Sequence, residues 1–424
     1  MELFLLYLNA FLRPLLSLDL SFGGPRATIV ELYDMVAMLL FAILCGAFFV
    51  NIAVRKQIRL SAVDLAIIAF GVWCVSIYFI YIDKANSRVM IKLIFPLFTY
   101  IVAKNVLKSV QEYQKMLGLM IAAFTVPVVV SVVLILMGHG VDYINYWTKN
   151  PRYEGAYDGA HALGHNMMFL LMLMAVYVTV CRYGACVQNP VIGWTKKLYL
   201  GGMGIAAFYC LLMSQTRTQL LGFIAFFGYF LFVFHRRVFY FGALAVAVIV
   251  IVMSSWLANN LFPDFERVEQ GQWGTQEIAS GRPRIWKYQL TIFADAPIDR
   301  QLAGLGIGNK EHLGGTEGIM ESHNDYLDLV IETGIVGLFL YLILQGLMLH
   351  KLLLLPGREK YVFLAMFGAV VMMNIGSNSY ITRSAIAQMF FLVMTYIELQ
   401  RLPTPQKKKI VPSARDIQDV HQSE

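Results

Sequence analysis

The chain has 424 residues, of which 58% are hydrophobic and only 14% are charged. This composition lies far outside the globular range and indicates a protein that crosses a membrane many times. In such a protein a net charge of +7 reflects topology signals and contacts with anionic lipid, so it does not indicate nucleic-acid binding.

The cysteines carry no sign of metal or redox chemistry. They lie within or beside apolar segments, and none belongs to a CxxC or another metal-like spacing. We therefore expect thiols that fill helix interfaces, with no metal site and no cofactor. The five are Cys45, Cys74, Cys181, Cys186 and Cys210.

The apolar segments predict an all-α polytopic membrane protein. A helix needs about 20 apolar residues to cross the hydrocarbon core, and about twelve such segments can be marked along the chain. The first contains Arg13 and Pro14 and could be a partly inserted or broken helix, although it lacks the features of a cleavable signal peptide. The segments lie near residues 3–20, 29–52, 62–82, 89–106, 116–138, 161–181, 197–214, 217–234, 238–257, 324–350, 361–378 and 383–400.

Short basic loops set the expected orientation. They all follow even-numbered spans, so with twelve spans they share one side of the membrane with both termini, and the positive-inside rule makes that side the cytoplasm. These loops are Arg55–Arg59, Lys104–Lys115, 182–197, His235–Arg237, Lys351–Lys360 and the tail from Arg401.

The opposite face carries two longer polar stretches. A small outer loop covers residues 139–160, within a first part of nine spans at residues 1–257. A large outer loop follows at residues 258–323, and we expect it to be partly helical and to carry active-site residues. Three further spans occupy residues 324–402, and residues 403–424 read as a disordered cytoplasmic tail.

A first polar cluster lies in the stretch MSQTRTQLLG, where Arg217 occupies the turn between the seventh and eighth spans. An arginine on the outer face has no topological reason to be there. Either it snorkels and bonds the carbonyls of a helix end, or it serves the function of the protein.

A second cluster lies in the stretch SGRPRIWKYQL, from Ser280 to Leu290. Guanidinium groups suit bidentate recognition of phosphate, and a helix that starts at Ser280 would add free N–H groups. The alternative is an amphipathic helix on the membrane surface, with basic residues toward lipid headgroups. The side chains concerned are Arg282, Arg284, Trp286 and Lys287.

A third cluster, ESHNDYLDLV, stands where a span begins. Ser322 or Asn324 suits the N-cap, and Asp325 and Asp328 suit the positive end of a helix. This arrangement leaves His323 unexplained, because a helix N-terminus disfavours a cationic imidazole and keeps it neutral and basic. His323 is therefore either a structural histidine or a general base.

Three motifs together resemble the O-antigen ligase and O-antigen polymerase superfamily. They are TRTQLLGF, then SGRPRIWKYQLTIFADAPIDRQLAGLGIGN, then SHNDYLDLVIETGIVGLFLYL. The resemblance rests on a GRxxxW pattern from Gly281 to Trp286, on a GLGIGN turn from Gly304 to Asn309, and on an HN pair followed by Glu332 and Gly334. It covers about residues 210–350, and the late large loop extends it over the chain.

The resemblance implies a glycosyl transfer at the periplasmic face of a Gram-negative inner membrane. The donor would be O-antigen on undecaprenyl diphosphate, and the acceptor would be lipid A core oligosaccharide. His323 would act as the base, and Arg217 and Arg282 would stabilise the diphosphate leaving group, without a metal ion. The expected substrate-binding residues are Arg284, Trp286, Lys287, Arg152, Asn324 and Asp325.

Other outer residues could also contact the substrates. Arg152, with Tyr153 and Tyr157, could bind sugar or core phosphates, or it could be an ordinary exposed arginine. Basic outer loops could guide the anionic glycolipid; the residues are Arg26, Lys84 and Arg88. Several phenylalanines could line a lateral opening for a polyprenyl tail or simply pack; these are Phe223, Phe226, Phe227, Phe230 and Phe232.

Three other functions compete with a ligase. An O-antigen polymerase would use the same donor with a second lipid-linked sugar as acceptor, and a ligase that glycosylates protein belongs to the same superfamily. A flippase or another transporter also suits twelve spans, but it predicts ionisable residues deep within spans and two related halves. The polar residues here gather on one face, which favours an enzyme.

Overall fold

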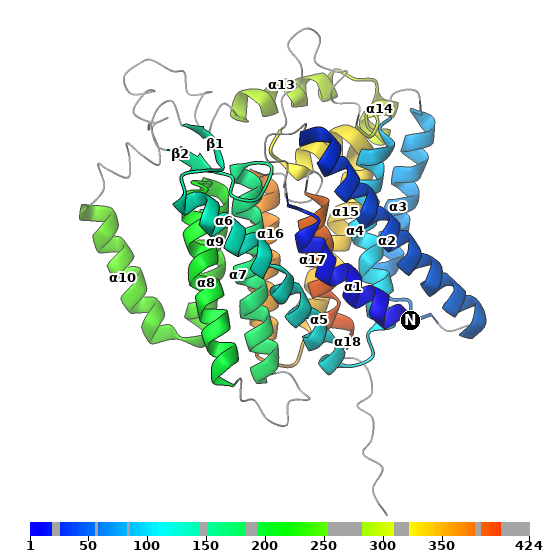
Figure 1. Cartoon of the computed structure of the whole chain (residues 1–424). Coiled ribbons are helices and arrows are strands. Elements are labelled where there is room, and N and C mark those ends of the chain that lie inside the picture. The colour runs from blue at the N-terminus through cyan, green and yellow to red at the C-terminus, as the bar shows by residue number, and fades with distance from the viewer. Residues whose placement is uncertain are drawn as a thin grey trace, which may run out of the picture.

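The computed structural model describes residues 1–18, 26–55, 58–82, 85–144, 151–183, 193–252, 282–308, 322–377 and 383–399. Within these residues the chain is a bundle of helices with one two-stranded antiparallel sheet at one end (Figure 1). Long runs of valine, isoleucine and leucine form helices here because a backbone in lipid must satisfy its hydrogen bonds internally. The expected all-α polytopic membrane protein is confirmed in this form.

The elements follow the predicted apolar segments closely. They are α1 (Glu2–Leu15), α2 (Arg26–Arg55), α3 (Ala62–Ile80), α4 (Ser87–Val106), α5 (Val110–Ala123), α6 (Thr125–Leu136), β1 (Val141–Ile144), β2 (Pro151–Tyr153), α7 (Ala160–Tyr183), α8 (Trp194–Met213), α9 (Arg217–Phe234), α10 (Arg236–Val252), α13 (Arg282–Ala294), α14 (Ile298–Ala303), α15 (Asp325–Leu353), α16 (Lys360–Gly376), α17 (Ser384–Met394) and α18 (Tyr396–Leu399).

In the described part of the chain, seven helices are long and apolar enough to cross a membrane. The helices α16 and α17–α18 are apolar but shorter, so the number of twelve spans stays a prediction. Helix α1 has 14 residues, which is less than a span needs. Its Arg13 is buried and donates through Nη2 to the Ser384 hydroxyl at 3.1 Å, so this helix is held by a polar contact as well as by apolar packing.

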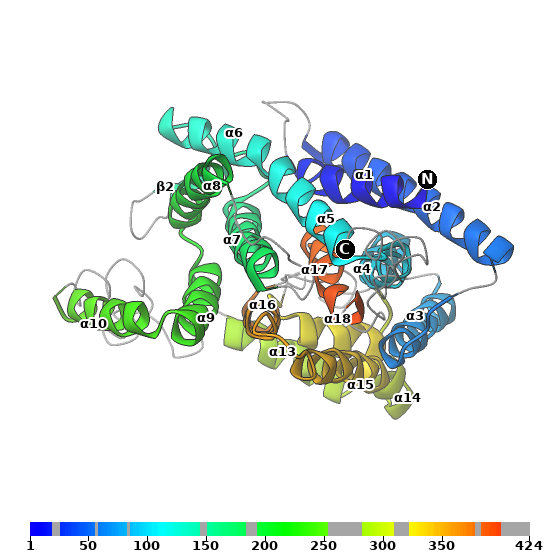
Figure 2. The same cartoon turned by 90° about the horizontal axis from the view of Figure 1, so that it is seen from below.

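Helix α7 forms the centre of the bundle. It is the most enclosed of the candidate spans, with 78% of its apolar window buried. It packs against α5, α8, α9, α16 and α17, which surround it in the view along the bundle (Figure 2). The first residues of α7 therefore lie at the middle of one end of the bundle. We call this end, which carries β1, β2, α13 and α14, the outer end (Figure 1).

Buried ion pairs close the opposite, inner end. Lys104 at the end of α4 pairs with Asp64 at the start of α3. Lys351 near the end of α15 pairs with Glu398 of α18, which also accepts a hydrogen bond of 2.9 Å from the Tyr100 hydroxyl. Each of these four charges has an opposite charge beside it, as buried ions require.

Helix α15 is not the single continuous helix that the sequence predicts. Gly334 has φ 73° and ψ −178°, a conformation open in practice only to glycine, and it divides the helix in two. In a straight helix Tyr326 and Gln345 would lie about 28 Å apart. Instead the Tyr326 hydroxyl donates to Gln345 Oε1 at 3.1 Å, so the first part of α15 folds against the second.

The break frees carbonyl groups that neighbouring elements use. The N–H of Leu305 donates to the Ile331 carbonyl at 2.7 Å, and the Trp73 indole donates to the Thr333 carbonyl at 2.8 Å. The glycine-rich turn that begins at Gly304 thus fits into the break at Gly334. The turn at Gly304 and the glycine at position 334 therefore form one packing contact.

Candidate functional site

Six basic side chains from six segments gather at the outer end. Arg152, Arg282, Arg383 and His323 all interact electrostatically with the ring of His161, and Arg217 interacts in the same way with Arg282. We call this group the outer basic cluster: Arg152 of β2, His161 of α7, Arg217 of α9, Arg282 of α13, His323 before α15 and Arg383 before α17.

Arg282 is held by the end of another helix. Its Nη1 donates to the carbonyl of Gly376, the last residue of α16, and the hydroxyl of Thr218 donates to the same carbonyl at 3.1 Å. Burial, and then the nearby charge of Arg217, lower the pKa of the Arg282 guanidinium. Its Nε is buried without a hydrogen bond to any described residue. Two like charges held together in this way favour the binding of an anion.

Arg217 and Arg152 are joined by the turn between α8 and α9. Arg217 is the first residue of α9. Arg152 Nε donates to the Ser214 carbonyl at 3.3 Å, and the Gln215 amide donates to the Pro151 carbonyl at 3.1 Å. Arg152 is only 8% exposed, so the alternative of an ordinary exposed loop arginine is wrong.

The backbone around His323 is strained and firmly bonded. His323 has φ 52°, a left-handed conformation that is uncommon outside glycine. The residue before it, Ser322, is fully buried, and its carbonyl accepts a hydrogen bond of 2.6 Å from the Trp286 indole. The residue after it, Asn324, is the N-cap of α15, as the sequence allows, and accepts from the N–H groups of Tyr326 and Leu327. Strain held in this way is typical of functional residues.

Two histidines of α7 extend the cluster inward. The rings of His161 and His323 lie 6.0 Å apart with an interplanar angle of 29°. Nδ1 of His165 lies 2.7 Å from the His161 carbonyl oxygen. The amide nitrogen of Gln219 lies 2.7 Å from Nδ1 and 3.1 Å from Nε2 of the same ring. The Gln219 amide also lies 3.5 Å from the Ser377 hydroxyl. This chain of contacts joins α7, α9 and the end of α16.

The sequence analysis did not single out His161, His165 or Arg383. Two histidines four residues apart at the start of a span, and an arginine just before another span, were the available signals. They were weak because each fits an ordinary helix end by itself. Only the packing of α7 and α17 against the other segments brings them to the cluster.

The other predicted residues have varied positions. Arg284 and Lys287 are exposed on α13, and Trp286 and Asn324 bond the backbone near His323. Asp325 is fully buried.

Some of the predicted residues lie outside the part of the chain that the structure describes. These are Ser280, Gly281, Lys84 and the side chain of Arg26. Arg88 is described and is half-buried. Among the described residues, no group of three His, Cys, Asp or Glu side chains could hold a metal ion.

Helix α13 covers α15 and does not lie free on the membrane surface. Phe293 and Trp286 of α13 pack with Leu327 and Ile331 of α15 in a small apolar cluster. Arg284 and Lys287 remain on the exposed side. On the side of Phe293 and Trp286 the helix is therefore covered by protein, which differs from the alternative of a helix on the membrane surface, while Tyr288 and Leu290 remain exposed.

The phenylalanines of α9 mostly pack. Phe226 is fully buried, Phe223, Phe227 and Phe230 pack against the core, and the rings of Phe223 and Phe227 are 4.5 Å apart. Phe232 is 40% exposed. Four of the five phenylalanines therefore pack within the protein, which was the alternative to lining an opening for a polyprenyl tail.

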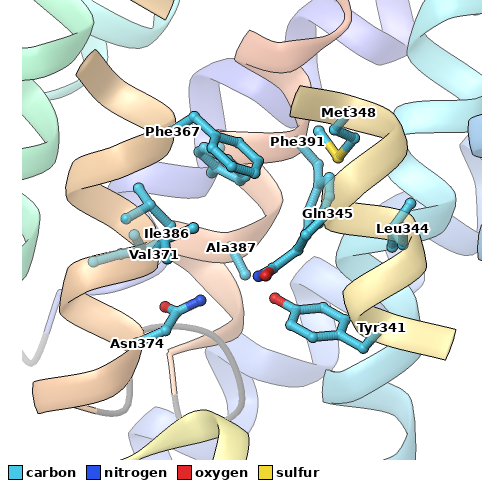
Figure 3. Close-up of a pocket in the computed structure, with 12 residues that line it drawn as sticks. Tyr341, Leu344, Gln345, Met348, Phe367, Val371, Asn374, Ile386, Ala387 and Phe391 are labelled. Carbon is cyan, nitrogen blue, oxygen red and sulfur yellow. The ribbon is translucent and has the colours of Figure 1, made fainter. Parts of the chain in front are cut away.

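A pocket lies between α15, α16 and α17, lined mainly by apolar side chains. The polar ends of Tyr341, Gln345 and Asn374 point toward one another within it (Figure 3). Gln345 also accepts the hydrogen bond from the Tyr326 hydroxyl. Asn374 lies two residues before Gly376, whose carbonyl accepts a hydrogen bond from Arg282. This polar patch therefore connects the bent α15 with the helix end that holds the outer basic cluster.

Comparison with known proteins finds a similarity over part of the chain. Residues 202–342 match the family model for O-antigen ligases, whereas no curated protein matches the chain. The matched region begins in α8 and ends in α15, so it includes Arg217, Arg282 and His323. Arg152, His161 and Arg383 lie outside it.

Proposed function

We propose that the protein is an O-antigen ligase, because residues 202–342 match the family model for O-antigen ligases. In this proposal it transfers O-antigen polysaccharide from undecaprenyl diphosphate to lipid A core oligosaccharide. The outer end of the bundle faces the periplasm, and both termini lie in the cytoplasm of a Gram-negative cell.

The outer basic cluster is the observation that supports this function best. Four arginines and two histidines from six segments gather there, while two ion pairs hold four charges at the inner end. A diphosphate carries several negative charges and several acceptor oxygens, and guanidinium groups bind such groups bidentately. A lipid-linked diphosphate would enter this end of the bundle with its tail in the membrane.

The proposed reaction is a direct displacement at the anomeric carbon of the first O-antigen sugar. A hydroxyl oxygen of the lipid A core attacks this carbon, and His323 takes the hydroxyl proton as general base. The bond between the anomeric carbon and the diphosphate oxygen breaks, and undecaprenyl diphosphate leaves with the bonding electrons. Attack opposite the leaving group inverts the configuration at the anomeric carbon.

Arg217 and Arg282 stabilise the negative charge that grows on the leaving diphosphate. A preorganised charge of this kind contributes about two to three orders of magnitude to the rate. The diphosphate is already a good leaving group, so the reaction needs no nucleotide. In this proposal the arginines supply the positive charge that a divalent cation would otherwise supply, which predicts activity in the presence of a chelator.

An in vitro transfer assay tests the proposal. Purified protein is mixed with undecaprenyl-diphosphate-linked O-antigen, lipid A core and a chelator, without nucleotide. Wild type is compared with His323→Asn, which tolerates the left-handed backbone, and with Arg282→Ala. Arg300→Ala, at an exposed position of α14, is the control.

We expect glycosylated lipid A core from wild type and from the Arg300 variant, and almost none from the other two. Chain extension with the donor alone, and no product with lipid A core, would make the protein a polymerase. Movement of the lipid-linked sugar across the membrane without a new glycosidic bond would make it a flippase. Full activity of the His323 variant would exclude His323 as the base.

A further inference from the structure

We propose that His161 is the positioning residue for the base: its ring stacks against His323 and fixes the direction of the nitrogen that takes the proton. This inference rests on the proposed function, because it assigns a role to His161 through His323. It adds a residue of α7, outside the matched region, to the three proposed catalytic residues, Arg217 of α9, Arg282 of α13 and His323 before α15.

The backbone on both sides of His323 is firmly held. Hydrogen bonds fix the backbone on both sides, through Ser322 to Trp286 and through Asn324 as N-cap. Backbone bonds do not fix the two side-chain torsions of a histidine, which determine where its nitrogens point. A ring stacked at 6.0 Å and 29° restricts these torsions directly.

His161 is well placed to act as a rigid surface. It lies in the first turn of the most enclosed helix, α7, and its carbonyl oxygen lies 2.7 Å from Nδ1 of His165. One turn further on, a side chain added at Gly164 would overlap the hydroxyl of Thr216, so the start of α7 is packed tightly against the turn before α9. The backbone that carries the His161 ring is therefore fixed relative to the turn before α9.

The surroundings of His161 indicate that the face of its ring, and not its Nδ1 atom, positions His323. Its Nδ1 is buried and makes no hydrogen bond to any described residue, so no polar contact of this atom explains the histidine. The charged and titratable groups that face it are Arg152 from β2, Arg282 from α13, Arg383 before α17, His323 and His165. An aromatic ring fills the space among these groups and contacts His323 at the same time.

The test separates ring stacking from nitrogen chemistry. In the transfer assay, kcat and KM are measured for wild type, His161→Asn, which lacks the ring, and His161→Phe, which keeps a ring but has no nitrogen. His350→Asn, at an exposed histidine near the inner end, is the matched control. Thermal unfolding in detergent shows that each variant is folded.

We expect His161→Asn to lower kcat by about 10- to 100-fold, because a small misplacement of a reacting group costs about this much, with KM within about threefold of wild type. His161→Phe should recover at least about a third of the wild-type kcat, as stacking by a second aromatic ring predicts. If His161→Asn is as active as wild type, or if His161→Phe is as slow as His161→Asn, the inference is wrong and the proposed function stands.

The proposed function has its own separate outcome. Wild type that makes no product with either acceptor would overturn the function, and the inference would fall with it. If wild type extends the donor chain instead, the same variants are scored on that product. A loss of folding in His161→Asn alone is resolved by His161→Phe, whose activity still has to exceed about a third of wild type.

Discussion

Arg282 combines a structural hydrogen bond with a buried Nε that makes no hydrogen bond to a described residue, and this division determines which substitutions it tolerates. Its Nη1 bonds the end of α16 at Gly376, while its Nε remains without a described partner beside Arg217. A lysine has one charged nitrogen and cannot hold the carbonyl and bind a phosphate oxygen with the fork geometry of a guanidinium.

We therefore predict that Arg282→Lys lowers kcat/KM by about 100-fold or more, close to the loss for Arg282→Ala. The measurement is the initial rate of transfer at several donor concentrations. Arg300→Lys, which changes an exposed arginine of α14 in the same way, should stay within about twofold of wild type. Wild-type rates from Arg282→Lys would show that charge alone is sufficient at this position.

Trp286 provides a second prediction for a single residue. Its indole donates to the Ser322 carbonyl at 2.6 Å and so fixes the backbone beside His323. Trp286→Phe keeps most of the apolar contact with α15 but removes this donor, which costs about 1 kcal/mol. We expect a loss of about 10-fold in kcat and a small change in the unfolding temperature. A rise in KM as large as the fall in kcat would instead indicate that Trp286 contacts the substrate directly.

At the level of the element, the break in α15 is the feature on which the site depends most. Gly334 accepts a backbone conformation that other residues avoid, and a side chain there would overlap the carbonyl of Leu302. The break turns the first part of α15, with its N-cap and His323, across the outer end. The same helix offers a control, because a side chain added at Gly346 would meet no atom within 4 Å.

We predict that Gly334→Ala lowers the unfolding temperature in detergent by several degrees and abolishes transfer, because strain and overlap add at one residue. Gly346→Ala should leave both nearly unchanged or raise stability slightly. Thermal unfolding and the transfer assay, on the same preparations, check both variants. A stable and active Gly334→Ala protein would mean that the break is not required.

For the whole molecule, the contrast between the two ends is the organising feature. At the inner end Lys351 is buried against Glu398, and removal of one partner leaves a buried charge without compensation, at a cost of about 3–5 kcal/mol. We predict that Lys351→Met lowers the unfolding temperature well below that of Lys108→Met, where the lysine is exposed. Equal unfolding temperatures would show that Glu398 finds another partner.

The orientation of the protein in the membrane can be tested with one exposed residue at each end of the bundle. Asp299 of α14 is exposed at the outer end, and Lys108 is exposed at the inner end. In intact cells whose outer membrane has been made permeable, a thiol reagent that cannot cross the inner membrane should label Asp299→Cys and not Lys108→Cys, with wild type as background. The reverse pattern would place the outer basic cluster in the cytoplasm and exclude the proposed substrates.

The sequence predicts the helices well because hydropathy measures what lipid requires of each segment separately. It also offers Asn324, beside Ser322, as the N-cap of α15, because a cap depends on neighbouring residues alone, and Asn324 is the one observed. It does not predict the break at Gly334, because a glycine within an apolar run is compatible with a helix. It misses His161 and Arg383 and leaves the burial of Arg152 open, because these depend on which helix ends meet across the bundle.

The outer basic cluster draws on residues from 152 to 383, while the family match covers only residues 202–342. The matched region therefore holds only three of the six residues of the cluster. A chimera that received only this region from a relative would join foreign counterparts of Arg217, Arg282 and His323 to the host's own Arg152, His161 and Arg383. Engineering of a new donor or acceptor preference would have to exchange β2, the start of α7 and the start of α17 together with that region.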